Sequence, residues 1–402
     1  MEYFPYLTEL SWLAFMLIAG IILSLLAKKI RFPDILLLII LGIIIGHLKL
    51  VTFTTQFLAA FSIFALIMIL FTSSSRFRPK EISSLSPHAI KLSLIFFILC
   101  SLFLTITTHF IFNISLTLNS ILVSLLFGTL MAGTSPSTVL TLLKEKKQKI
   151  AEILEFEAIF NTPLMVILPL MILDYLKGTV LKVHDIAIKF LQNIMTGVGT
   201  GLVIGLIIFR LMKRKYLEMI SPLVIIAAAL LTYTIAEYIG GSGILSVTML
   251  GIVFGWSQLK EKQALDKFSN TFTNFLKIIV FILLGLTIKI PYKNTDFLIT
   301  SLILFSVFLL IRFFAVNSAF ANTKVNFKER LFMTFNISKG VAVAVVAFVL
   351  FSFLKEIPDL SLIIDLSFLF ILYSVIISSI SGAFSKYFLE AKESLDKFKK
   401  VK

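Results

Sequence analysis

The chain has 402 residues, of which 58% are hydrophobic and only 15% are charged. A soluble domain has about 45–50% apolar and about 25% charged residues, and a globule in water needs more polar cover than this sequence supplies. The composition therefore excludes an ordinary soluble domain and predicts an integral membrane protein whose main solvent is the lipid bilayer. The net charge of +15 would also suit nucleic acid, so the positions of the basic residues must decide between the two partners.

Apolar runs recur along the whole chain. A transmembrane helix needs about 20 mostly apolar residues. By this criterion we predict an all-α polytopic membrane protein with about thirteen transmembrane helices. The expected spans are 8–27, 34–50, 56–73, 89–113, 118–143, 150–176, 186–212, 218–239, 243–257, 272–290, 296–322, 329–354 and 362–388.

Lysine and arginine concentrate in every second loop between these spans. The basic loops are 28–31, 76–91, 144–149, 210–215, 260–267 and 324–330, followed by the tail from 386 onward. Cytoplasmic loops carry an excess of Lys and Arg, so we expect the C-terminus to be cytoplasmic and the N-terminus to lie outside. The positive charge then reflects topology and contact with anionic lipid, and no nucleic-acid partner is expected.

The fifth span is interrupted near its middle. Gly133 permits a turn, and Thr134 or Ser135 can cap a new helix. Pro136 cannot continue an incoming helix but starts a new one well. A kinked continuous helix is the alternative, because Pro and Gly are tolerated in membranes. We favour two half-helices, because another span is interrupted as well.

The twelfth span carries a lysine in mid-membrane, where a charge is costly. Lys339 lies between Ser338 and Gly340. The fifth and twelfth spans run in opposite directions, and paired interruptions in such spans indicate an inverted-repeat transporter with a site near the midplane. The sequence therefore predicts inverted repeats with two interrupted crossing helices.

The sixth span supplies an acid inside the membrane. Glu157 and Asn161 are one helical turn apart and share a face. An intramembrane acid indicates function by default, and its alternative is a structural ion pair with Lys339 or Arg312. We predict that Glu157 pairs with Lys339, because each charge alone would be costly in a low dielectric.

No sequence feature indicates a cofactor. Cys100 is the only cysteine, and the four histidines lack the spacing of metal ligands. There is no nucleophile–base pair and no cofactor motif. We therefore expect no metal, no cofactor and no enzymatic activity.

The order of these motifs resembles the monovalent cation:proton antiporters of the NhaP-like and sodium/hydrogen-exchanger type. The resemblance covers nearly the whole chain and rests on the stretches 28–46, 64–82, 127–143, 154–164, 221–256, 279–290 and 336–344. It implies antiport of a monovalent cation against protons, and sodium is the cation we expect first. It also implies a homodimer in a prokaryotic cell membrane.

The family fold implied by the resemblance divides the chain into two bundles. The first and second parts of a dimerisation bundle are expected at 1–73 and 177–290, the latter including a linking helix. The two halves of a core transport bundle are expected at 74–176 and 291–390, and 391–402 form a basic cytoplasmic tail.

The ion site departs from the family pattern. The aspartate of the family's crossing helix falls on Ser135, its ion-binding aspartate on Thr162, and its arginine on Lys339. A hydroxyl can coordinate a cation but cannot carry the proton as a carboxylate does. The resemblance places ion-binding or transport residues at Thr134, Ser135, Glu157, Asn161 and Thr162, and a core ion pair among Glu157, Lys339 and Arg312.

Two alternatives follow from this departure. In the first, the protein transports another solute on the same fold. An anionic solute would suit a half-helix N-terminus and the cations Lys339 and Arg312. The second alternative is a homologue that does not transport and acts as a sensor or scaffold.

The distribution of basic loops yields a test of topology. We expect a cysteine introduced in the loop 144–149 to react with a membrane-impermeant reagent only from the cytoplasmic side, because basic loops stay inside. Labelling of that loop only from outside would overturn both the orientation and the thirteen-helix count.

Overall fold

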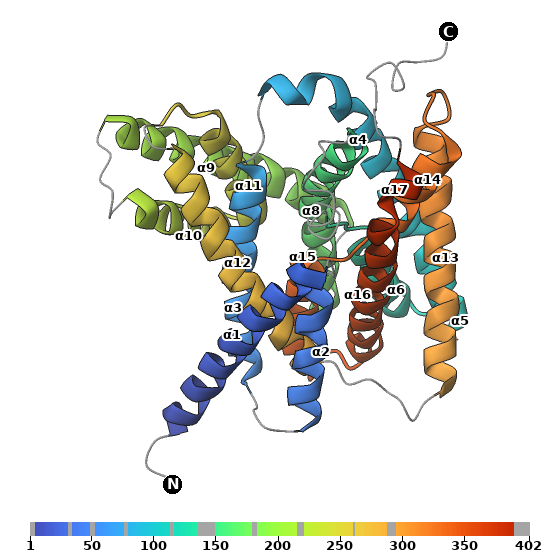
Figure 1. The fold of residues 1–402 in the computed structure, drawn as a ribbon. Helices are drawn as coiled ribbons and strands as arrows, with labels where there is room; N and C mark the ends of the chain where they lie inside the picture. The colour runs from blue at the N-terminus through green and yellow to red at the C-terminus, as the bar shows by residue number, and fades with distance from the viewer. Residues whose placement is uncertain are drawn as a thin grey trace. The chain divides into compact units, whose positions relative to one another are not determined.

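A computed structural model describes residues 5–30, 34–48, 53–75, 79–112, 114, 116–135, 149–178, 183–214, 221–259, 262–287 and 295–389. All regular structure in these ranges is helical (Figure 1). The elements up to the first interruption are α1 (Pro5–Ile30), α2 (Asp34–His47), α3 (Thr55–Ser74), α4 (Pro79–Leu99), the π-helical turn η1 (Cys100–Leu104), α5 (Thr105–Ile111) and α6 (Leu118–Met131). The remaining elements are α8 (Lys149–Leu176), α9 (Val183–Arg214), α10 (Ser221–Tyr238), α11 (Gly243–Trp256), α12 (Lys262–Thr287), α13 (Thr295–Ala319), α14 (Phe327–Phe335), α15 (Val341–Ser352), α16 (Leu360–Ala383) and α17 (Ser385–Phe388).

The helices coincide with the expected spans. Nine of the described helices are long and apolar enough to cross a membrane, and α2, α6, α11 and α15 are shorter apolar helices. The prediction of an all-α membrane protein is therefore confirmed. The number of crossings stays a prediction, because part of the fifth expected span lies outside the described residues.

The helices form two compact groups, each described by itself. The first group comprises Met1–Ala59, Leu85–Pro169 and Ile278–Lys402, and the second comprises Ala60–Ser84 and Leu170–Lys277. The first group contains both interrupted spans and every expected site residue. The division into dimerisation and core bundles stays a prediction.

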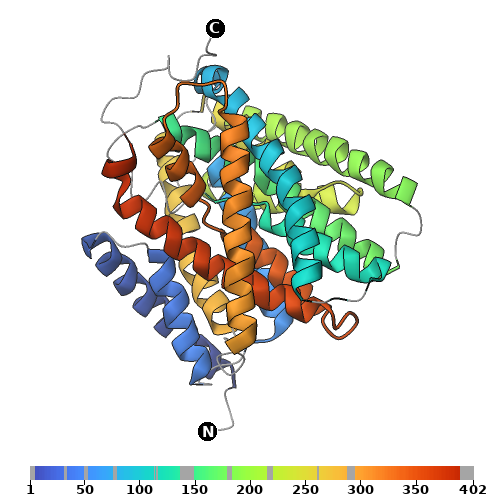
Figure 2. The same ribbon diagram turned by 90° about the vertical axis from the view of Figure 1, so that its right-hand side faces the viewer.

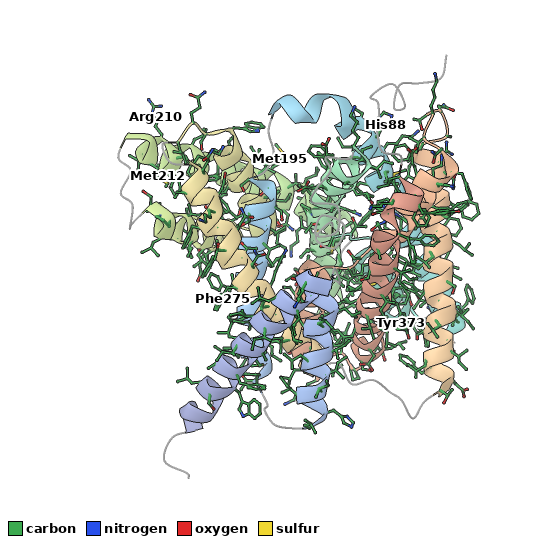
Figure 3. The ribbon with its side chains drawn as sticks, viewed as in Figure 1. His88, Met195, Arg210, Met212, Phe275 and Tyr373 are labelled. Atoms are coloured by element: carbon green, nitrogen blue, oxygen red, sulfur yellow. The ribbon has the colours of Figure 1, made fainter. Side chains whose placement is uncertain are left out.

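In the first group, α13 lies beside α16 and beside the run α4–η1–α5 (Figure 2). Phe305 and Phe308 of α13 contact Phe370 of α16, with ring centroids 5.1 and 5.5 Å apart. The hydroxyls of Ser301 and Tyr373, which Figure 3 labels on α16, are hydrogen-bonded at 3.0 Å. Aromatic rings bury a large apolar area, so phenylalanine side chains fill the space between α13 and α16. Cys100 is also buried here, in η1.

The second group is held by close helix contacts. A β-carbon on Gly197 of α9 would lie 2.6 Å from the carbonyl oxygen of Ser242, so only glycine permits this approach to the start of α11. Glu237 of α10 accepts a hydrogen bond from the backbone N–H of Gly243 at 2.8 Å. Its carboxylate therefore satisfies a free amide at the first turn of α11, a contact that the sequence did not predict.

In the first group, α2 and the last turns of α12 meet backbone to backbone. A β-carbon on Gly42 would overlap the carbonyl oxygen of Ile282 and lie 2.8 Å from the Cα of Gly285. A β-carbon on Gly285 would overlap the carbonyl oxygen of Ile39 and lie 2.9 Å from the Cα of Gly42. Small residues at such a crossing let helix backbones approach, which drives helix association in lipid.

We expect Gly42→Val to destabilise the protein by about 1–3 kcal/mol or more, because the added methyl groups have no space and must separate the two helices. Thermal unfolding in detergent would measure the loss. Gly199→Val is the matched control, because nothing lies within 4 Å of a β-carbon at this helical glycine. Equal melting temperatures for the two variants would contradict the contact.

Candidate functional site

The fifth span is interrupted where the sequence predicts. The helix α6 ends at Met131, and 132–135 are not helical. A β-carbon on Gly133 would lie 2.6 Å from the flexible side chain of Met165 on α8, so a larger residue here would have to displace that side chain. The restart expected at Pro136 lies outside the described residues.

The twelfth span is interrupted between α14 and α15, and 336–340 are not helical. An interruption frees backbone amides that water cannot reach in a membrane. Three serines on one face of α16 supply acceptors: Ser374 for the N–H of Lys339 (3.0 Å), Ser378 for the N–H of Ile337 (3.2 Å) and Ser381 for the side-chain amide of Asn336 (2.9 Å). The helix α16 thus holds three of the five residues of the interruption.

The two interruptions touch each other. The N–H of Ser135 donates to the carbonyl of Ser338 at 2.8 Å, and the hydroxyl of Ser338 donates to the carbonyl of Ser135 at 2.7 Å. A β-carbon on Gly340 would lie 2.5 Å from the side chain of Ser135, so the contact requires a glycine there. The predicted crossing of two interrupted spans is confirmed.

Lys339 lies at the end of α6. Its ammonium donates hydrogen bonds to the carbonyls of Met131 and Gly133, the latter at 2.6 Å. It also lies 4.4 Å from the ring centroid of Phe308, and the residue is 1% exposed. The last carbonyls of a helix have no partner within it and carry the negative end of the helix dipole. Among the described residues, the hydrogen bonds of this cation therefore go to carbonyl oxygens and not to a carboxylate.

Glu157 of α8 is paired with Arg312 of α13. Nη1 donates to Oε1, and Nη2 donates to Oε2 at 2.7 Å. Both residues are fully buried, and the guanidinium lies 4.7 Å from the ring centroid of Phe96. The prediction that Lys339 is the partner of Glu157 is therefore wrong. Arginine presents a planar fork that matches both carboxylate oxygens, whereas the lysine ammonium is drawn to the free carbonyls of α6.

Two buried oxygen atoms beside the first interruption have no hydrogen-bond partner among the described residues. They are Oδ1 of Asn161 and Oγ1 of Thr134. The amide nitrogen of Asn161 donates to the carbonyl of Ala132, so its oxygen lies close to the same stretch of backbone. Buried polar atoms are nearly always satisfied, and a pair of unsatisfied acceptors at an interrupted helix is suited to a cation.

The expected site residues thus divide into two sets, and Thr162 belongs to neither. Thr134, Ser135 and Asn161 lie at the interruptions together with Lys339, whereas Glu157 and Arg312 form a closed pair. The hydroxyl of Thr162 donates to the carbonyl of Ala158 on its own helix at 2.6 Å. The roles of these residues in transport stay predictions.

Sequence reasoning missed the serines of α16 and the carbonyls that hold Lys339. The serine signal was available, because Ser374, Ser378 and Ser381 follow the i, i+4, i+7 spacing of one helix face in an apolar span. The carbonyls leave no signal in the sequence, since every residue has a backbone carbonyl.

The chain is similar to known cation:proton antiporters over most of its length. A family model described as "Sodium/hydrogen exchanger, transmembrane" matches residues 13–384. Na(+)/H(+) antiporter 1 of Methanocaldococcus jannaschii is 26% identical over 360 residues, which cover 84% of this chain and 82% of that protein. The K(+)/H(+) antiporter NhaP of Alkalimonas amylolytica is 24% identical over 367 residues, which cover 89% of this chain and 62% of that protein.

A solved structure has the same fold. The sodium proton antiporter MjNhaP1 from Methanocaldococcus jannaschii at pH 8 superimposes with a TM-score of 0.79 at 21% sequence identity. The match covers 94% of this chain and 97% of that chain. The two chains therefore share the arrangement of their helices. Because the sequence identity is low, this match establishes the fold and not the activity.

The bidentate pair generates a stability prediction. We expect Glu157→Gln to destabilise the protein by about 3–5 kcal/mol, because the charge of Arg312 would stay buried without its partner. The double variant Glu157→Gln, Arg312→Met should recover much of this loss, since it leaves no buried charge behind. Thermal unfolding of both variants measures the effect.

Glu356→Gln is the matched control, because Glu356 is exposed. The pairing would be refuted if the double variant were less stable than Glu157→Gln alone.

Proposed function

The chain belongs to the sodium/hydrogen exchanger family, and on that premise we propose that it is a secondary transporter that exchanges a monovalent cation for protons. The observation that carries this proposal is the crossing of the two interruptions with two oxygens, Oδ1 of Asn161 and Oγ1 of Thr134, that find no hydrogen-bond partner in the part of the chain that the structure describes. Interrupted helices at the centre of a membrane protein are where transporters of inverted-repeat type bind their ions. The protein is integral to a membrane, and the substrate is an ion that crosses it unchanged.

The substrate is an alkali cation, sodium or potassium. The oxygens at the crossing belong to an amide, a hydroxyl and backbone carbonyls, and neutral oxygens of this kind replace the hydration shell of such ions. The related proteins are named for exchange of Na(+) in one case and K(+) in another. Both ions therefore enter the test below.

The same geometry speaks against an anionic solute. The two buried cations that would attract an anion are already engaged, Arg312 by the carboxylate of Glu157 and Lys339 by two carbonyls. An anion would have to displace these bonds before it met a free positive charge. The structure therefore supports the anionic alternative less than the sequence does.

The assembly and orientation belong to the proposal as well. We propose a homodimer in a prokaryotic cell membrane, with 1–73 and 177–290 forming the dimerisation bundle and 74–176 and 291–390 the transport core. The tail 391–402 is proposed to be cytoplasmic, since the basic loops lie on its side of the predicted topology. The support for these points is the family resemblance and the charge pattern.

Flux into proteoliposomes tests the activity. With a pH gradient imposed, sodium, potassium or lithium should dissipate the gradient through the wild-type protein, and replacing one small anion by another should not. Asn161→Leu should lower the exchange rate at limiting cation about tenfold or more, because leucine keeps the volume but removes a coordinating oxygen, and each 1.4 kcal/mol is a factor of ten.

Asn270→Leu is the control for this variant, because the side-chain amide of Asn270 likewise donates to a backbone carbonyl, that of Asp266 one turn back in its own helix. A wild-type protein that moves no cation against protons, but moves anions, would refute the proposed function.

A further inference from the structure

Exchange requires one site that holds either the cation or the proton. A carboxylate meets this requirement because protonation removes its charge. At the two positions where the family resemblance expects aspartates, this chain has Ser135 and Thr162, whose hydroxyls do not titrate in the physiological range. The proton must therefore be carried by another group near the crossing.

Four groups that titrate or carry charge face one another here. Lys339 interacts electrostatically with Cys100 of η1, Arg312 of α13 and Glu157 of α8. Its backbone N–H donates to the hydroxyl of Ser374 on α16, and its ammonium donates to the carbonyls of Met131, the last residue of α6, and of Gly133. These neighbours define which group is free to exchange a proton.

Three of the four groups are unsuited to carry it. Both oxygens of Glu157 are held by Arg312, and a guanidinium is not deprotonated in proteins. Cys100 would have to become a thiolate in a fully buried position, where an anion is costly. Lysine, in contrast, is a compact cation that becomes neutral when it loses one proton.

The position of the Lys339 ammonium adds the decisive observation. It is bonded to the carbonyls of Met131 and Gly133. Between these two lies the carbonyl of Ala132, which is bonded to Asn161. Thr134, whose Oγ1 has no hydrogen-bond partner among the described residues, follows in the same stretch, and Oδ1 of Asn161, reaching the stretch from α8, also has none there. A positive charge that is attached to the chain is therefore already bonded to two of the carbonyl oxygens in this stretch, those of Met131 and Gly133.

We propose that the Lys339 ammonium is a tethered competitor of the transported cation for the carbonyl oxygens of Met131 and Gly133. This inference rests on the proposed antiport and names the group that couples its two fluxes. When the ammonium loses a proton it loses its charge and one of its donors, and the alkali cation binds to the carbonyls with help from Asn161 and Thr134. When the proton returns, the ammonium displaces the cation.

The step is balanced in charge. The protonated site carries the charge of the ammonium, and the loaded site carries the charge of the alkali cation beside a neutral amine. One proton leaves for each cation that enters, and the Glu157–Arg312 pair is unchanged. The site therefore has the same charge in both halves of the transport cycle, so a membrane potential should not drive the exchange.

The closing experiment measures cation binding and exchange with two variants of the full-length protein. Wild-type affinity for sodium or potassium should fall about tenfold for each pH unit below the titration of Lys339, because one proton competes with one cation. Lys339→Arg keeps donors for both carbonyls but does not release its proton, so it should bind the cation at least about tenfold more weakly at every pH. Lys339→Met removes the competitor, so its cation affinity should no longer depend on pH.

Lys355→Arg is the matched control, because Lys355 is exposed, and size-exclusion profiles report whether each variant is folded. A folded Lys339→Arg variant with wild-type binding and pH dependence would overturn the proposal. The proposed function itself would fail differently, since the wild-type protein would then show no exchange at all.

A rescue distinguishes a missing proton carrier from a damaged site. Adding Thr162→Asp to Lys339→Met should restore pH-dependent exchange, because the carbonyls are then free of a competing cation and the carboxylate supplies a new group that titrates. A folded double variant that stays inactive would count against the proposal.

Discussion

The structure depends on one constraint: backbone groups released by two helix interruptions must find partners where no water is available. The interruptions solve part of this problem together, because Ser135 and Ser338 exchange hydrogen bonds. The rest of the solution comes from outside them, from the serines of α16 and from Lys339. Satisfying the backbone therefore also decides which helices pack together and where a buried positive charge is placed.

Much of this fold could be predicted from the sequence, because lipid imposes strict requirements on length and hydropathy. The spans, the end of α6 near Gly133 and the interruption around Lys339 followed from apolar length and from residues that violate it. Membership of the family was also predicted, from the order of the motifs, and is confirmed. Boundaries were less certain, since amphipathic helices such as α12 extend beyond the apolar run that marks them.

Partner choice at the site could not be predicted in the same way. The sequence offered Lys339 and Arg312 as cations for Glu157, and charge alone does not distinguish them. Shape does, because a guanidinium matches two carboxylate oxygens, and an ammonium matches converging carbonyls such as those of Met131 and Gly133. That convergence exists only once α6 ends and α15 crosses it, so it belongs to tertiary structure and not to any local pattern.

The burial of Cys100 in η1 has a practical consequence for spectroscopy. The chain holds a single thiol, and that thiol is fully enclosed, so the native protein is close to a silent background for spin labels and fluorophores. Pairs of labels attached to exposed positions on α13 and α16 would report on the interior of the first group of helices by pulsed electron resonance. Such distances can be followed while sodium, potassium or pH is varied, without first rebuilding the protein around a removed cysteine.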